Sequence, residues 1–188
     1  MKPVALAVAL FLSVGLAVGS KADYASVKKK FQSLDKVAMK PGTKVAISSA
    51  ELNAYVQTEL PAIAPPGIRN PRVELHGNNT ATGTAVIDFI KLRSSRGKET
   101  SWMMRKLFEG EREVSVTTRV SSGGGKATVD LQRVEVSGIP IQGAALDFLL
   151  ENYLIPNYPQ AKIGRPFALH SRIDRIEVQP GVAYVVTR

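Results

Sequence analysis

The side chains that could carry catalytic chemistry are few in this chain. Asp147 and Glu151 lie four residues apart, so on a helix both carboxylates share one face, as an acid–base or metal-binding pair requires. Apolar residues surround them, so we favour the alternative that they form the solvated stripe of a buried helix. The two histidines, His76 and His170, are far apart and lack HExxH-type spacing. We expect both to be surface or hydrogen-bonding residues.

Nucleophilic and phosphate-binding motifs are absent from the sequence. The chain has no cysteine, which excludes a thiol enzyme, and no Gly-x-Ser-x-Gly nucleophile elbow. The run Gly123-Gly124-Gly125-Lys126 lacks the P-loop spacing and is typical of a hairpin turn. The sequence therefore predicts a protein that is not an enzyme, with no catalytic residue, no metal ligand and no cofactor. A hydrolase using the carboxylate pair or a histidine is the minor alternative.

Cations and large apolar side chains are interspersed in the segment 91–110. It holds the only tryptophan, and a loop of this composition can dock on an anionic bilayer, with each cation contributing about 1 kcal/mol. The alternative is a crossover helix that buries its large apolar side chains in the core. Both hold if the segment is a lid over a pocket. The predicted membrane and headgroup contacts are Arg93, Arg96, Trp102, Met103, Arg105, Lys106 and Phe108.

The first 22 residues have the pattern of a secretory signal peptide. Lys2 precedes an apolar run from Val4 to Val18, and the small residues Ser20 and Ala22 fit cleavage before Asp23. The run is short for a bilayer span, so an uncleaved membrane anchor is the alternative. Either way, we expect residues 23–188 to form one domain on the periplasmic or extracellular side, large enough to bury a core without disulfides.

The charge of the predicted mature chain is strongly positive. Without Lys2 and Lys21, 23 basic residues stand against 16 acidic ones, which leaves a net charge of +7. Such a surface favours anionic partners. Outside the cytosol these are phospholipid headgroups, lipopolysaccharide or acidic glycans, and no aromatic-basic motif indicates a nucleic acid.

Two amphipathic helices are expected first in the mature chain. Apolar residues recur at helical spacing over 24–38, with Asp23 as a possible N-cap, and this helix ends before Pro41-Gly42. Ser48-Ser49-Ala50-Glu51 has capping-box spacing and begins a second helix, which we expect Pro61 to stop.

Three strand–turn–strand units follow. Alternating residues predict hairpins turning at 77–79, at 121–125 and at 179–181. The alternation changes parity at Gln132-Arg133, which predicts a bulge that restores the inward face. Between the last two hairpins, residues 144–155 predict a helix that is apolar around most of its circumference. Such a helix must be covered on several sides, which indicates a cavity or a partner.

Several segments together resemble a known family. Ser49 to Tyr55, Val129-Asp130-Leu131, Ile139-Pro140-Ile141 and the stretch from Phe167 to Val182 are similar to the small bacterial members of the tubular lipid-binding (TULIP-like) superfamily, which is related to bactericidal permeability-increasing proteins. The resemblance implies an α+β fold, in which a strongly curved antiparallel sheet, a meander of hairpins, wraps around a long apolar helix. It also implies an apolar groove that holds the acyl chains of a lipid.

We therefore expect a secreted lipid-binding or lipid-transfer protein that contacts an anionic membrane surface. Small residues on inward faces, such as Ala81, Gly83 and Ala85, leave room for a groove or allow close packing. The alternative is a non-catalytic envelope interaction or assembly protein with a filled core. The predicted groove residues are Leu52, Tyr55, Val56, Phe89, Leu131, Leu146, Phe148, Leu149 and Tyr153.

Overall fold

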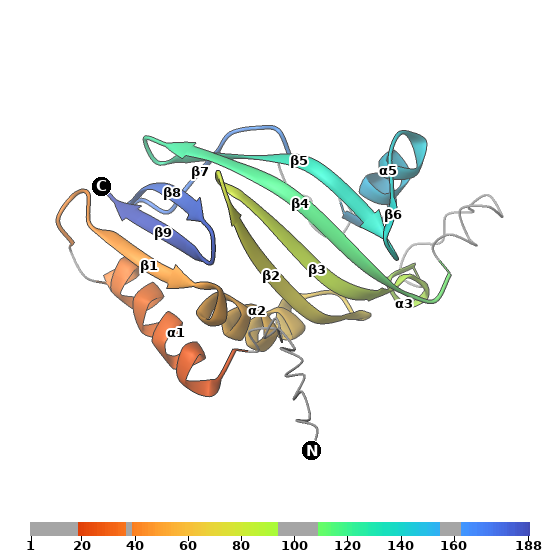
Figure 1. Ribbon diagram of the computed structural model, residues 1–188, viewed down its shortest axis with the longest axis horizontal. Coiled ribbons are helices and arrows are strands. Elements are labelled where there is room, and N and C mark those ends of the chain that lie inside the picture. The colour runs from red at the N-terminus through yellow and green to blue at the C-terminus, as the bar shows by residue number, and fades with distance from the viewer. Residues whose placement is uncertain (1–18, 37–38, 94–108, 155–162) are drawn as a thin grey trace, which may run out of the picture.

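Two antiparallel sheets form most of the protein, as the computed structural model shows (Figure 1). The structure describes residues 19–36, 39–93, 109–154 and 163–188. The smaller sheet has the order β1 (Lys44–Ser48), β9 (Val182–Thr187) and β8 (Ile173–Gln179). The larger sheet has the order β2 (Ile68–Gly77), β3 (Thr80–Asp88), β4 (Glu111–Gly123), β5 (Lys126–Val136) and β6 (Ile139–Pro140), and β7 (Phe167–Ala168) pairs with β5.

Each end of the molecule is covered by its own pair of helices (Figure 1). The helices are α1 (Lys21–Lys36), α2 (Ser49–Ile63), α3 (Phe89–Arg93), α5 (Ala144–Leu149) and the π-helical turn η1 (Leu150–Leu154). Helices α1 and α2 lie beside the smaller sheet, where Val27, Leu34, Ile47 and Val185 form one buried cluster. Helices α3 and α5 lie at the other end, where a second cluster is centred on Phe89 and Val136.

This architecture contradicts the predicted fold class. The protein is mostly antiparallel sheet with short helices, the sheets are not strongly curled, and the described residues contain no long apolar helix. The segment expected as one helix over 144–155 is divided into α5 and the π-helical turn η1. Its Asp147 and Glu151 are exposed while Leu149 is buried, so it packs on one side only. A helical segment that is buried on one side can lie on one face of a sheet, so the predicted wrapping of the sheet around it is not needed.

The three predicted hairpins are confirmed, and so is the bulge. Asn78 and Asn79 both have positive φ, +49° and +58°, as a two-residue type I′ turn between β2 and β3 requires. The strands β4 and β5 extend further than expected, so their turn consists of Gly124 and Gly125 alone. Between the pairs Thr117–Arg133 and Thr118–Leu131 the register shifts, which leaves Gln132 as the extra residue of β5.

The helix ends agree only in part with the sequence signals. The capping box at α2 is confirmed, because Ser48 Oγ accepts from the Glu51 N–H and the Glu51 carboxylate accepts from the Ser48 N–H. Pro61 does not stop this helix, which continues to Ile63. Asp23 is not the N-cap of α1. It bonds back to Ser20 from within the first turn, so the predicted cleavage point lies inside this helix.

Side chains close the backbone edges where the two sheets and α2 meet. Asn53 of α2 donates to the Val73 carbonyl and accepts from the Val73 N–H, both at 2.8 Å, as a neighbouring strand would. On β8, Ile176 exchanges the same pair of bonds with Ser122 Oγ, at 2.8 Å each. These bonds satisfy peptide groups that exposed edges leave open. The Asn53 bonds fix α2 to the larger sheet, and the Ser122 bonds fix the smaller sheet to the larger one.

Candidate functional site

An apolar cavity of about 220 Å³ lies against the larger sheet. Strands β2 to β5, helices α3 and α5, the turn η1 and the connecting segments at Pro65 and Ile163 contribute to its lining, and every lining residue that the structure describes is apolar except Thr118. The lining residues are Pro65, Ile68, Ile87, Phe89, Leu92, Val114, Val116, Thr118, Val129, Leu131, Val134, Leu146, Leu149, Leu150 and Ile163.

Strand alternation places the sheet residues that line this cavity. Val114, Val116 and Thr118 occupy every second position of β4, so all three face the same side. On β5, Leu131 and Val134 differ in parity, and both line the cavity because the bulge at Gln132 lies between them. The bulge detected in the sequence therefore gives β5 an unbroken apolar inner face.

Helical residues close the cavity opposite the sheet. Leu146, Leu149 and Leu150 follow at three- and four-residue spacing, so α5 and the start of η1 present one apolar stripe to the cavity. Phe89 is 1% exposed and begins α3. It packs with Leu149 and Val136 in the core cluster beside the cavity, which gives the space a closely packed wall.

The chemistry of the described lining disfavours an ionised group in the space. None of the lining residues that the structure describes is charged, and burying a charge without a partner costs far more than hydrocarbon burial returns. The described residues also contain no group of histidines and carboxylates that could hold a metal ion. What fits the cavity is hydrocarbon.

The predicted groove residues are placed in two regions. Phe89, Leu131, Leu146 and Leu149 line the cavity, and Phe148 packs against the core cluster next to it. Leu52 and Tyr55 pack instead on the cluster between α1 and the smaller sheet, where Tyr55 meets Phe31 edge to face at 4.8 Å. Val56 is half-buried on α2 and does not line the cavity. Tyr153 belongs to η1, and its side chain lies outside the described residues.

The predicted membrane contacts fall almost entirely outside what the structure describes. Arg93 ends α3, with its side chain outside the described part. Arg96, Trp102, Met103, Arg105, Lys106 and Phe108 lie outside the described residues.

Several lining residues were missed by the sequence reasoning. Val114 and Val116 alternate on the first strand of the hairpin predicted to turn at 121–125, and that alternation was the signal that could have assigned them to the cavity. Pro65, Ile68 and Ile163 lie in connecting or strand-end positions far apart in sequence, and no local pattern relates them.

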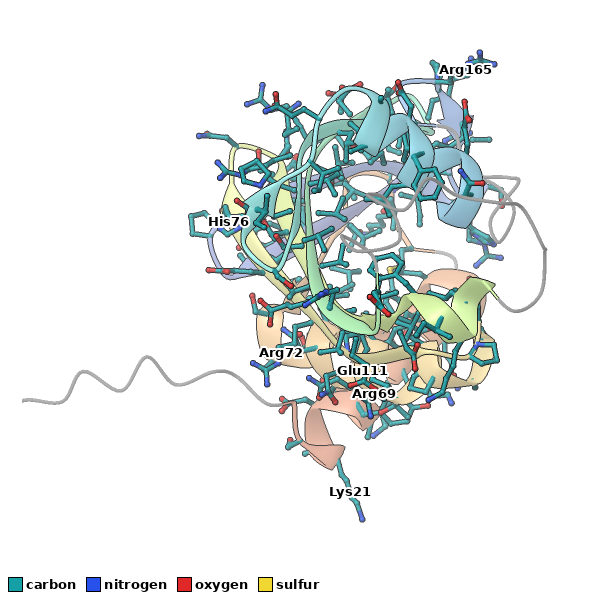
Figure 2. All side chains as sticks on the ribbon, turned by 90° about the vertical axis from the view of Figure 1, so that its right-hand side faces the viewer. Lys21, Arg69, Arg72, His76, Glu111 and Arg165 are labelled. Carbon is teal, nitrogen blue, oxygen red and sulfur yellow. The ribbon has the colours of Figure 1, made fainter. Side chains whose placement is uncertain are left out.

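The side chains considered for catalysis do not come together. His76 is exposed, and its Nε2 lies 2.8 Å from Thr82 Oγ1 on the outer face of the sheet (Figure 2). His170 is exposed and lies 3.7 Å from Asp35. Asp147 and Glu151 are both exposed, as expected of a solvated stripe.

Comparison of the chain with family models, with curated proteins and with solved structures finds no match. The resemblance to the TULIP-like family therefore stays a prediction. Among the described residues, no helix has the length and apolar character needed to cross a membrane.

Proposed function

We propose that this protein binds the hydrocarbon part of an amphiphilic lipid and carries it between membranes. The observation that supports this is the apolar cavity, whose described lining residues offer dispersion contacts and no charged partner. Binding of this kind needs no catalytic group. It agrees with the scattered placement of the histidines and carboxylates in the described chain.

The size of the cavity limits what enters it. Apolar cavities of about 150 Å³ stay dry and admit benzene-sized molecules. A space of about 220 Å³ is therefore suited to a short or medium acyl segment and not to a whole phospholipid. The polar head of the ligand stays outside, in contact with water or a membrane.

The proposed setting is outside the cytosol, by way of the signal peptide predicted over residues 1–22. A carrier of acyl chains is useful there, because lipids exchange slowly through water and the cost of exposing each CH₂ is about 0.8 kcal/mol. The predicted anionic membrane partner belongs to the same proposal.

Native mass spectrometry of the chain recovered from a bacterial envelope fraction tests this function. We expect a stoichiometric lipid adduct, whose class follows from solvent extraction of the same sample. A ligand-free mass together with a defined oligomer would instead support the interaction protein with a filled core.

A matched pair of variants assigns the adduct to the cavity. Val116→Phe fills the space, and we expect loss of the adduct with the fold retained. Val86→Phe adds the same volume to the opposite face, because Val86 precedes the cavity residue Ile87 on β3 and alternation reverses its direction. Equal binding by both variants would contradict the assignment.

A further inference from the structure

The two most exposed large apolar side chains in the described chain belong to two segments that pack on one another. Ile63 ends α2 and is 74% exposed, and Ile90 in α3 is 59% exposed. Each is adjacent in sequence to residues that line the cavity: Pro65 and Ile68 follow Ile63, and Phe89 and Leu92 flank Ile90. We call residues 63–68 and 89–92 the lip.

Backbone contacts hold the two halves of the lip together. The Asp88 N–H donates to the Gly67 carbonyl at 2.7 Å, and a Cβ on Gly67 would meet the Asp88 carbonyl oxygen at 2.9 Å. The Asp88 carboxylate accepts from the N–H groups of Ile90 and Lys91, and these bonds fix the start of α3. These bonds fix the backbone at Ile90 and join it to Gly67, four residues after Ile63.

The lip has little net charge of its own. Lys91 is the one charged residue of the lip, and it is paired with Asp88 at 3.1 Å. Next to the lip, Arg69 is paired with Glu111, as Figure 2 shows. Paired charges attract a charged partner weakly. The exposed apolar side chains therefore determine what this surface contacts.

We propose that the lip inserts Ile63 and Ile90 into the surface of a lipid bilayer, next to the point where an acyl chain enters the cavity. This rests on the proposed function, and it extends that function by naming the docking surface. Apolar side chains then continue from the bilayer into the cavity, so a chain passes without being exposed to water.

A bilayer suits this surface better than a protein partner does. A stable protein interface buries about 800 Å² on each side, which two isoleucine side chains are far from supplying. A bilayer sets no such minimum, since each apolar side chain that reaches the hydrocarbon adds its own contribution.

The absence of cysteine allows a test at single positions in the full chain. A polarity-sensitive fluorophore is attached to the Ile63→Cys and Ile90→Cys variants, and to Ala168→Cys as control. Ala168 is exposed on β7, away from the lip along the sheet (Figure 1). With phosphatidylcholine vesicles, we expect blue-shifted emission at 63 and 90 but not at 168. Added phosphatidylglycerol attracts the positive net charge and strengthens this contact, but it is not required for it. Equal emission at all three positions would overturn the proposal.

Charged variants complete the test. The double variant Ile63→Asp, Ile90→Asp should lose about tenfold or more of the lip's vesicle contact, and Ala168→Asp should lose none. Contact that needs phosphatidylglycerol and vanishes in salt would assign docking to cations elsewhere and overturn the proposal. A soluble oligomer broken by the double variant would indicate a protein interface and would also overturn it. Lipid binding in solution reports on the cavity separately: a wild type that docks but carries no lipid contradicts only the proposed function.

Discussion

The two ends of this protein solve opposite packing problems. At the junction of α1, α2 and β1, polar groups are buried together and each has a partner. Glu51 is only 8% exposed, and it is bonded by Lys30, Ser26 and the Ser48 N–H. At the other end, the described residues that line the cavity of about 220 Å³ carry no charge.

This difference shows which end of the molecule depends on exact hydrogen-bond geometry and which end is held by apolar contacts. The polar junction has one arrangement that satisfies every group, since the Lys30 ammonium also donates to the Ala46 carbonyl on the free edge of β1. The cavity walls are held by non-directional contacts, which tolerate changes of shape. A rigid frame beside an adaptable pocket would suit the proposed function as a carrier.

The largest effect is expected at the cavity wall. Phe89→Ala removes a fully buried ring and enlarges the cavity, which should destabilise the protein by about 3–5 kcal/mol. Denaturant melts in the presence and absence of benzene measure both the loss and its recovery. We expect benzene to restore part of the stability in the variant. A variant that gains nothing would show that the wall collapses onto the space.

Breaking the ion pair tests the polar junction by the same measurement. Lys30→Met leaves the Glu51 carboxylate buried without its cation, and we expect a loss of about 3 kcal/mol. Lys28→Met serves as the control, because the Lys28–Glu59 pair is largely exposed. Comparable losses for the two variants would contradict the special role of the junction.

Acid should weaken the junction and leave the cavity lining unaffected. Burial raises the pKa of Glu51, but the bonds from Lys30, Ser26 and the Ser48 N–H outweigh burial and lower it from 4.5 to about 2. A carboxyl whose pKa is lower in the folded state stabilises the fold above the unfolded pKa. That stability, roughly 3 kcal/mol, is therefore lost as the pH falls from about 4.5 towards 2.

Melts across this pH range should show a shallower decline in Glu51→Gln than in the parent protein. The variant is less stable at neutral pH, so the comparison concerns slopes and not absolute stability. Parallel slopes would mean that other carboxyls, such as Asp88, carry the acid sensitivity.

Signals that act over a few residues predicted local elements correctly, although the predicted fold class was wrong. The capping box at Ser48 and the bulge at Gln132 were both visible, since each depends on neighbours in sequence. Strand β1 was missed because its five residues are stabilised by β9, far along the chain. We expected Pro61 to end the second helix because proline lacks the N–H that a helix interior needs, but α2 continues to Ile63.

The candidate site was less predictable for the same reason. Amphipathic spacing in α2 correctly indicated that Leu52 and Tyr55 face a core, but it does not say which one, and they pack near α1 instead of the cavity. The cavity is the space left between Ile68, Ile87, Val116 and Ile163, which come from four separate segments. Such a space is formed by tertiary packing, and the sequence of any single segment does not predict it.

The smallest of these effects concerns the bond that ties the two ends together. Asn53 is 6% exposed and supplies both hydrogen bonds that Val73 at the edge of β2 would otherwise lack. Asn53→Leu keeps the volume but leaves these peptide groups unpaired, which should cost about 1–3 kcal/mol. Hydrogen exchange should show faster exchange at the Val73 amide while amides of α5 stay protected. If exchange rises equally at both ends, the frame and the pocket are one cooperative unit, and the division between them does not hold.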